Sequence, residues 1–462
     1  MSLPLKVLDL FAGPGGLSLG FDLVNYNGKK AFEIIKLVEI DDFACKTLGK
    51  NYGEEKVLQG DLTKDEIKER IIDECKNLEK SIDLIMAGIP CQSFSLIGPR
   101  SGNNNKKDDR DSLYKEFYDI VKELNPKIFL IENVKGILSK KDSKNIKIID
   151  KIISDFENLG YNLSNTENNN KYLLLNAVHF GVPQRRERVF IIGIKKELEK
   201  SIPLPKQTHY YTQPQNQKKL IKEQSNSLCE LKKFISIKEA IGDLPELNAK
   251  CTYTDLNEKK KKEINLLNQE IDKSNSSGIN NKQINETEKE KYLKFLKSLL
   301  NFNSALDFQI FVRNSEFIQG HIARSQQFSD IEIFKLLPEG WTSKDVFSNS
   351  ITDSEEIVKL KNELRKLIKY DCSDSFPDKY RKQKWNEPST TILTHLQKDG
   401  NRFIHPKQAR TFTPREAARL QSFPDSFIFE GPMTQQFKQI GNAVPPLLAK
   451  ALAEVIAQVL LF

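Results

Sequence analysis

Short apolar runs alternate with amphipathic stretches through the first 195 residues, and this alternation limits the fold more than any other feature of the chain. Apolar runs that predict strands lie at Leu5–Leu10, Ile34–Ile40, Ile82–Ala87, Ile128–Ile131 and Val189–Ile194. Helical patterns follow the first glycine loop through Tyr26 and then occur at Asp42–Tyr52, Thr63–Leu78, Ser112–Leu124 and Ile146–Leu159. Strands that alternate with helices indicate an α/β fold, in which helices cover both faces of a mostly parallel sheet.

The regular alternation stops near residue 200. Pro203, Pro205 and Pro214 interrupt it, and residues 256–293 are rich in Lys, Glu and Asn. That composition predicts either a solvated helix or a flexible insertion. We therefore expect residues 200–430 to form a second, smaller domain with a hinge.

Regular structure is expected again near the C-terminus. A helix should begin after Thr413, with Thr413 as its N-cap, Pro414 at the first helical position and Glu416 completing a capping box. Pro445–Leu461 is strongly apolar, and a helix of this kind is buried. We therefore expect residues 432–462 to return to the first domain, residues 1–195, and to complete its core.

Composition excludes several classes of protein. The formal net charge of +8 is modest for 462 residues, so it permits a phosphate-backbone partner but is equally explained by a bias toward Lys and Asn. The six cysteines show no metal-ligand spacing, and we expect reduced thiols, no metal and a cytoplasmic location. The N-terminus lacks a signal-peptide pattern and no stretch approaches ~20 apolar residues, so we expect no membrane span.

A glycine-rich loop joins the first predicted strand to its helix. Gly13, Gly15 and Gly16 allow the backbone to approach a ligand closely, as in nucleotide-type sites. Pro14 and Ser18 depart from the strict dinucleotide fingerprint. The loop by itself is therefore a weak signal.

Acidic residues follow the next two apolar runs. Glu39 ends the second strand, where a carboxylate is placed to hold ribose hydroxyls, and Asp61 lies where it could meet an adenine amino group. Each acid alone is more often an exposed loop carboxylate. Together with the glycine loop they indicate an adenosine-containing ligand, and both NAD and S-adenosylmethionine remain candidates.

Three further segments carry chemistry at strand ends. Cys91 follows the strand Ile82–Ala87 directly, although a lone cysteine is more often a buried structural residue. Glu132 ends the next strand, which should place its carboxyl beside the cysteine loop. Arg186 and Arg188 alternate in an extended segment, so they should share a face and could hold a ring carbonyl or a phosphate.

The sequence resembles the DNA (cytosine-5) methyltransferase family, of the bacterial restriction-modification type. The blocks that carry the resemblance occur in the family's order: Asp9–Gly16, Glu39–Asp41, Gly60–Asp61, Pro90–Gln92, Glu132–Val134, Gln184–Arg188, Arg410–Arg419 and Gly441–Pro445. They cover the first 195 and last 55 residues, roughly. The resemblance implies a Rossmann-like catalytic domain at residues 1–195 and a target-recognition domain at residues 200–430.

The resemblance also implies the roles of individual residues. Cys91 would be the nucleophile on a flipped-out cytosine, Glu132 would bind and protonate its ring nitrogen 3, and Arg188 would hold the ring oxygen with support from Arg186. Residues implied to bind S-adenosylmethionine, with S-adenosylhomocysteine as product, are Asp9, Phe11, Gly13, Gly15, Gly16, Glu39, Ile40, Asp61, Leu62, Pro90, Leu113, Asn442 and Ala443. Residues expected to contact DNA are Gln92, Ser93, Ser95, Arg324 and Thr391.

Alternatives remain at this stage. The same chemistry on tRNA is disfavoured by the long recognition segment, and a nonenzymatic DNA-binding regulator is disfavoured by the retention of Cys91, Glu132 and Arg188. The Pro-Cys-Gln block disfavours an NAD-dependent dehydrogenase. A solitary methyltransferase fits the residues as well as one paired with a restriction endonuclease. We expect a monomer that acts on duplex DNA.

Overall fold

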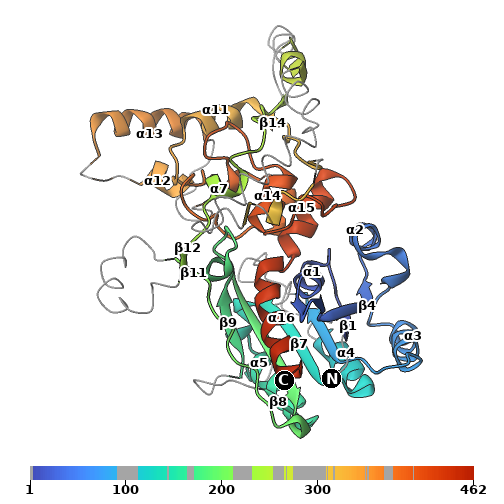
Figure 1. Ribbon diagram of the computed structural model, residues 1–462. Helices are drawn as coiled ribbons and strands as arrows, with labels where there is room; N and C mark the ends of the chain where they lie inside the picture. The colour runs from blue at the N-terminus through green and yellow to red at the C-terminus, as the bar shows by residue number, and fades with distance from the viewer. Residues whose placement is uncertain are drawn as a thin grey trace. The chain divides into compact units, whose positions relative to one another are not determined.

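A computed structural model gives the fold of the chain. It describes residues 4–90, 113–142, 145–163, 171–211, 231–252, 265–266, 268–273, 308–309, 311–315, 318–348, 350, 353–368, 378–398 and 400–461. The chain divides into two compact units (Figure 1). Unit 1 comprises Met1–Leu231, Ile428–Glu430 and Ala443–Phe462, and unit 2 comprises Lys232–Phe427 and Gly431–Asn442.

Unit 1 contains a mostly parallel sheet, as the sequence predicts. Its strand order is β5-β4-β1-β6-β7-β10-β8, with β9 paired to β10. The parallel strands are β5 (Val57–Gln59), β4 (Phe32–Glu39), β1 (Leu5–Leu10), β6 (Leu84–Gly88) and β7 (Ile128–Val134). The antiparallel strands are β10 (Glu187–Lys195), β8 (Tyr161–Leu163) and β9 (Leu173–Asn176). The antiparallel direction of β10 places its first residues at the edge where β7 ends.

Helices bury both faces of this sheet. Alternate residues of the central strands belong to two separate apolar clusters: Val7 and Met86 lie in one, Leu8 and Ile85 in the other. The first cluster is covered by α1 (Gly16–Asp22), α2 (Asp42–Tyr52) and α16 (Pro446–Leu461), and the second by α3 (Asp65–Lys76), α4 (Leu113–Leu124) and α5 (Ile148–Asn158). Burial on both faces explains why the strands read as continuous apolar runs.

The C-terminal helix α16 packs against α1 (Figure 1), and its apolar residues form part of the first cluster. The two helices meet at Gly20, where a Cβ atom would lie 2.3 Å from the Cβ of Ala449 and 2.6 Å from the oxygen of Pro446. Only glycine permits so close a crossing.

The predicted helix through Tyr26 is too long, because α1 ends at Asp22. Residues Asn25–Tyr26 (β2) instead pair with Lys29–Lys30 (β3) in a short hairpin. Its two turn residues, Asn27 and Gly28, have φ values of 49° and 76°. An Asn-Gly pair favours this two-residue turn, and that local preference overrides the continuing helical pattern.

One stretch of the described chain is long and apolar enough to count as a candidate membrane span, contrary to the expectation above. It is Met433–Leu461, with a mean hydropathy of 1.6, and 61% of the window that qualifies is buried within the protein. Burial of this kind is typical of a core helix, and α16 supplies much of the first apolar cluster.

Unit 2 is built from short elements around a small apolar core. Its helices are α7 (Ile237–Ile241), α11 (Phe328–Leu336), α12 (Ser343–Phe347), α13 (Glu355–Leu367), α14 (Pro414–Leu420) and α15 (Met433–Asn442), and its two-residue strands include β13 (Cys251–Thr252) and β14 (Gln326–Gln327). The predicted start of α14 is confirmed: Thr413 is the N-cap, Pro414 follows, and Glu416 closes the capping box. The lysine-rich segment 256–293 lies almost wholly outside the described residues.

Candidate active site

The order of strands in unit 1 reverses between β1 and β6. From β1 the sheet continues to β4 and β5 on one side, whereas from β6 it continues to β7 on the other. Ligands of open α/β sheets bind outside the carboxyl ends of the strands at such a point. The described residues that the sequence predicts at the site and that follow β1, β4, β5 and β6 or end β7, such as Gly13, Glu39, Asp61, Pro90 and Glu132, belong to this edge.

The loop between β1 and α1 has an unusual backbone conformation. Phe11, Gly13 and Gly15 have φ values of 55°, 55° and 90°. A Cβ atom on Gly15 would lie 2.8 Å from side-chain atoms of both Leu48 and Tyr52, whereas one on Gly13 would meet nothing within 4 Å. The loop is therefore packed tightly against α2 on one side and leaves open space at Gly13, and its positive φ at Phe11 is a strain of the kind found at functional sites.

Glu39 connects this loop to the start of α2. One carboxylate oxygen accepts a hydrogen bond from the Gly13 N–H at 2.7 Å, and the other accepts from the N–H groups of Ile40 and Asp41 at 2.9 Å each. A carboxylate offers about four acceptor positions, so one remains for a ligand hydroxyl. The neighbouring Asp61 accepts from the backbone and the hydroxyl of Thr63 through one oxygen only.

Asp9 is fully buried beneath the loop. Its Oδ2 accepts a hydrogen bond from the Ser18 hydroxyl at 2.6 Å, whereas its Oδ1 has no hydrogen-bond partner within the described part of the protein. Burial raises the pKa of Asp9 to about 7; the Ser18 bond lowers it and the charge of Glu39 raises it further. A buried acceptor without a partner fits a cationic or hydrogen-bond-donating ligand group.

Glu132 and Arg188 meet on neighbouring strands. In the register of the sheet Glu132 lies opposite Gly88 of β6 and Phe190 of β10, and Arg188 precedes Phe190 by two residues, so it lies on the same face. The Arg188 Nε lies 2.8 Å from the Glu132 Oε1. Burial raises the pKa of the Glu132 carboxyl, although the charges of Arg188 and Arg186 oppose this.

Arg186 and Asn133, near Arg188 and Glu132 in the chain, form hydrogen bonds to segments outside β7 and β10. The Arg186 Nη2 donates to the backbone oxygen of Ala443 at 3.0 Å, which holds the predicted C-terminal block next to β10. The Asn133 side chain donates to the oxygen of Ile89 at 3.4 Å, one residue before Pro90. Both side chains are buried.

The remaining predicted residues have varied surroundings. Leu62 is buried, Leu113 begins α4 half-buried, Pro90 and Ile40 are exposed, and Asn442 ends α15 in unit 2. Cys91, Gln92, Ser93 and Ser95 lie outside the described residues.

Sequence reasoning missed three residues that shape the site: Ser18, Tyr52 and Asn133. Tyr52 donates to the oxygen of Gly15 at 2.7 Å, and its ring occupies the space that a Gly15 side chain would need. Ser18 had been noted only as a departure from a glycine fingerprint. The available signal for their contact was position, because Asp9 lies near the end of β1 and Ser18 in the first turn of the helix that follows.

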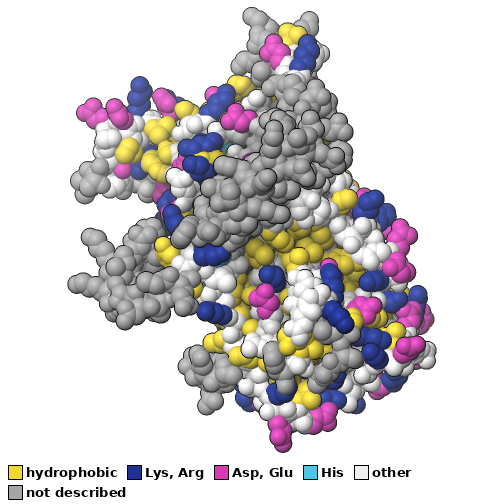
Figure 2. All heavy atoms as spheres, viewed as in Figure 1, with side chains coloured by type: hydrophobic (Ala, Val, Ile, Leu, Met, Phe, Trp, Pro, Cys, Tyr) yellow, Lys and Arg dark blue, Asp and Glu magenta, His cyan; other side chains and the backbone are white. Residues whose placement is uncertain are grey.

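In unit 2 the two residues expected to contact DNA are held by their own unit. The Arg324 Nη2 donates to the oxygen of Gln397 at 3.0 Å, and its guanidinium lies 5.0 Å from the ring centre of Phe437. Thr391 is half-buried beside the buried Ile392. On the face drawn in Figure 2, Lys and Arg side chains are interspersed with Asp and Glu rather than gathered in one stripe.

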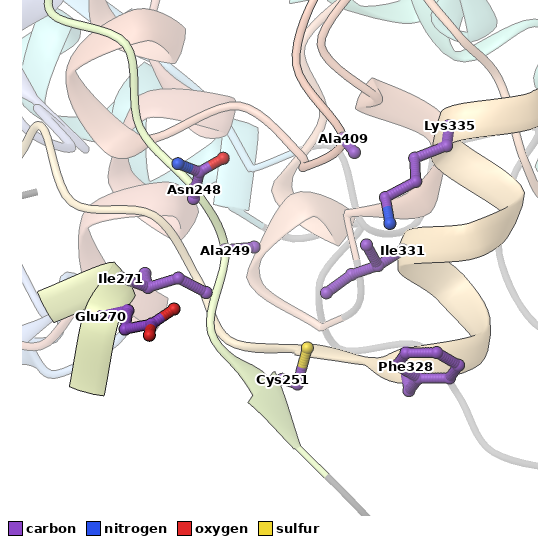
Figure 3. A pocket seen from close by; sticks show the side chains of 9 residues that line it. All are labelled: Asn248, Ala249, Cys251, Glu270, Ile271, Phe328, Ile331, Lys335 and Ala409. Atoms are coloured by element: carbon purple, nitrogen blue, oxygen red, sulfur yellow. The ribbon is translucent and has the colours of Figure 1, made fainter. Parts of the chain in front are cut away.

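A pocket of about 370 Å³ lies in unit 2 (Figure 3). Ile331 and Lys335 of α11 line one side, and Ala249 and Cys251 line another. None of the predicted site residues lines it. Burial raises the pKa of the Cys251 thiol, which keeps that thiol protonated.

The sheet order and the residues at its carboxyl edge define an α/β fold of Rossmann-like type with a buried acid, Glu132, at the end of β7. The profile of the C-5 cytosine-specific DNA methylase family matches residues 5–458, and the chain belongs to this family. It is a DNA (cytosine-5-)-methyltransferase.

Two relatives and one solved structure illustrate the similarity. The type II methyltransferase M.DdeI of Desulfomicrobium norvegicum is 31% identical over 97% of this chain and 88% of its own. The type II methyltransferase M.AgeI of Thalassovita gelatinovora is 28% identical over 98% of this chain and 99% of its own. The crystal structure of a prophage-encoded Escherichia coli chain, described as a DNA modification methyltransferase, shares the fold with a TM-score of 0.58 and 24% identity, over 99% of this chain and 100% of that one.

Proposed function

We propose that this enzyme transfers a methyl group from S-adenosylmethionine to carbon 5 of a flipped-out cytosine within a specific duplex DNA sequence, through a covalent adduct with Cys91. The observation that carries the proposal is the buried Glu132–Arg188 pair. Glu132 lies on β7, next to β6, and Arg188 lies on β10, the next strand along, at the sheet edge that also bears the glycine loop. Cys91 follows the end of β6 by three residues.

The residues at the end of β1 and β4 fit S-adenosylmethionine. The buried Asp9 oxygen suits an ammonium group, the backbone at Gly13 is open, and the spare acceptor of Glu39 suits a ribose hydroxyl. When bound, the cofactor supplies an electrophilic methyl group. NAD would supply hydride chemistry, for which Cys91 and Glu132 have no evident use.

The proposed chemistry assigns each catalytic residue a step. The Cys91 thiolate adds to carbon 6 of the cytosine, and the Glu132 carboxyl gives its proton to nitrogen 3, so that carbon 5 becomes nucleophilic. After carbon 5 has taken the methyl group, a base or water accepts the proton of carbon 5, the Cys91 thiolate leaves carbon 6, and the proton on nitrogen 3 returns to Glu132. The raised pKa of Glu132 favours the protonated carboxyl that this step requires.

Arg188 and Arg186 support that step. Through its Nε, Arg188 fixes the carboxyl of Glu132, and its remaining N–H groups suit the ring oxygen. Arg186 holds Ala443 in place and adds positive charge near the carboxyl. Both guanidinium groups stabilise negative charge that develops on the ring.

We assign the reading of the DNA sequence to unit 2, which corresponds to the expected recognition domain. A cytosine must leave the duplex before carbon 5 is reachable, and the energy of unstacking would come from contacts with the rest of the site. M.DdeI and M.AgeI are named type II methyltransferases. We therefore propose that this enzyme protects cytoplasmic DNA from a partner restriction endonuclease.

Bisulfite sequencing of DNA from cells that express the protein tests the function. Methylation of cytosine at one recurring sequence is expected, and unmethylated DNA together with methylated tRNA would refute the proposal in favour of the tRNA reading. Duplex carrying 5-fluorocytosine at that sequence should form a covalent complex with the wild-type protein, because fluorine does not leave as a proton does.

The Cys91→Ala variant should form no complex and show no methyl transfer. Cys75→Ala is a matched control, because burial raises the pKa of the Cys75 thiol to about 11, and an un-ionised thiol does not act as a nucleophile. Equal trapping by Cys91→Ala and the wild type would exclude the covalent mechanism.

A further inference from the structure

The side chain of Asn51, in the last turn of α2, pairs with the backbone of a segment far along the chain. Its Nδ2 donates to the oxygen of Ile428 at 2.8 Å, and its Oδ1 accepts from the N–H of Ile428 at 3.0 Å. The second hydrogen of Nδ2 is used at the oxygen of Thr47, at 2.7 Å. A side-chain amide that satisfies both backbone groups of one residue imitates a strand pairing, and it holds that residue in one position.

Thr47 adds a second attachment one turn earlier on α2. Its hydroxyl accepts a hydrogen bond from the N–H of Glu430 at 2.9 Å, and the side chain is fully buried. Residues 428–430 are thus held at both ends by α2. We call this set of contacts, made by Asn51 and Thr47, the α2 clasp.

Helix α2, which carries the clasp, also contacts the surroundings of the glycine loop, residues 11–16, here called the cofactor loop. At its end, Tyr52 donates to the oxygen of Gly15 at 2.7 Å. At its start, Asp41 caps the helix through the N–H of Ala44 at 3.0 Å, and Asp41 itself donates its N–H to Glu39. A shift of α2 would therefore move the contacts of Gly15 and of Glu39 together.

The clasped segment occupies a special place in the chain. Residues 428–430 belong to unit 1, but the residues on both sides of them, up to Phe427 and from Gly431 to Asn442, belong to unit 2. The chain also passes between the units at Leu231–Lys232 and at Asn442–Ala443, but residues 428–430 are bounded by unit 2 on both sides. The clasp therefore links α2 to a segment of unit 1 that is continuous in the chain with unit 2 at both ends.

We propose that Asn51 is a positioning residue that couples occupancy of the cofactor site to the segment 428–430, and through it to the unit that reads DNA. The inference rests on the proposed use of S-adenosylmethionine. Coupling between two binding sites is reciprocal. Bound cofactor should therefore rigidify residues 428–430, and bound DNA should alter the affinity of the enzyme for the cofactor.

Hydrogen–deuterium exchange with S-adenosylhomocysteine as the probe tests this. In the wild-type protein the product should slow exchange about fivefold or more both in the loop 11–16 and at residues 428–430. In Asn51→Ala the product should still protect the loop, but its effect at residues 428–430 should vanish. Asn51→Asp should behave like Asn51→Ala, because a carboxylate lacks the donor and repels the two carbonyl oxygens.

The matched control is Asn158→Ala. Asn158 is also an asparagine at the end of a helix, α5, but it is exposed. That variant should retain the wild-type response at both sites. Thermal unfolding of each variant is measured beside the exchange, so that a general loss of stability is recognised by faster exchange that does not depend on the product.

Steady-state kinetics gives a second readout. Asn51→Ala should raise the KM for S-adenosylmethionine several-fold in the presence of duplex DNA and change kcat less. A product effect at residues 428–430 that is unchanged in Asn51→Ala, or absent from the wild type although the loop is protected, overturns the inference. Failure of the product to protect even the loop would instead reject the proposed cofactor, and the inference with it.

Discussion

Each unit contains a buried glutamate that faces an arginine, yet the two carboxyl groups are shifted in opposite directions. In unit 1, Glu132 meets Arg188 through a single contact of 2.8 Å, and burial raises its pKa. In unit 2, Glu416 also lies in a buried site that alone would raise its pKa, but the charge and hydrogen bonds of Arg410 outweigh burial and lower it. Residue type therefore does not decide the protonation state.

The number of donors explains the difference. Glu416 accepts from Arg410 at both oxygens, at 2.8 and 2.6 Å, and from the N–H of Thr413 at 2.8 Å. Three of its roughly four acceptor positions are filled by the protein, two of them by a charged guanidinium, so it is a structural anion that closes the α14 capping box. Glu132 has one charged donor, so it retains the capacity to hold a proton and to bind a ligand.

Asp9 extends the series to a carboxyl with no charged donor. It accepts one neutral hydrogen bond, from Ser18, and its pKa is raised to about 7. Because the only hydrogen bond found to the Asp9 carboxyl among the described residues comes from a neutral hydroxyl, it opposes the effect of burial on the pKa of Asp9 only weakly. The two carboxyl groups of this series whose pKa is raised, Glu132 and Asp9, both lie in unit 1, at the proposed site.

The largest expected effect follows from removing the acid of unit 1. Glu132→Gln should lower the rate of methyl transfer by roughly 10²–10⁴-fold, the usual contribution of a general acid, with little change in thermal stability. Because the pKa of Glu132 is raised, the active protonated form of the wild type is lost as pH rises, so the transfer rate should fall on the alkaline side. Measured pH–rate profiles should lose that limb in the variant.

The control for this prediction is Glu187→Gln. Glu187 is exposed and pairs with Lys135 at 3.0 Å, one residue before Arg188 in the chain. It should keep near wild-type activity. Full activity in Glu132→Gln would show that Glu132 is not the general acid, and the difference in pKa between Glu132 and Glu416 would then have no functional consequence.

The matching substitution in unit 2 should act on stability. Glu416→Gln leaves Arg410 with a poorer partner in a fully buried site and should cost about 3–5 kcal/mol in urea unfolding. The folded-state pKa of Glu416 is lowered, so its contribution is present above the ordinary value of 4.5 and is lost as pH falls below it. The difference between the two proteins should therefore shrink in acid, and a constant difference would contradict the assignment.

Asp9→Asn should stabilise the free protein at alkaline pH. The pKa of Asp9 is raised from 3.8 to about 7, so the stability linked to its protonated form is complete below pH 3.8 and is lost as pH rises through 7. Asparagine removes this loss, which is about 4 kcal/mol at pH 8. Unfolding curves at pH 5 and pH 8 check the prediction, and the variant should bind S-adenosylhomocysteine more weakly.

The smallest expected effect concerns the single donor to Asp9. Ser18→Ala removes that donor, so the pKa of Asp9 should rise above about 7 and the loss of stability with rising pH should continue to a higher pH. The lost hydrogen bond should cost about 1 kcal/mol where Asp9 is ionised. An unchanged midpoint in the pH dependence of stability would show that donor number does not control this carboxyl.

Much of unit 1 could be predicted because its signals are local. The strands read as apolar runs and α2 has the predicted bounds. In unit 2 one local signal was equally clear, because Thr413, Pro414 and Glu416 mark the start of α14. Capping and periodicity depend on residues a few positions apart, so they are visible in the chain. The family was evident from blocks of this kind, and the family profile confirms it.

What the sequence determined by itself was thus the α/β class, the family and the candidate residues at strand ends. Only the tertiary structure decided that β10 runs antiparallel and places Arg188 next to Glu132. It also decided that Arg410, Arg415 and Arg419 are buried, and that Asn51 forms hydrogen bonds to Ile428, 377 positions away. Such contacts depend on strand order and on packing between distant segments, which leave no periodic or local trace. The charge state of each buried carboxyl likewise follows from how many donors the fold collects around it.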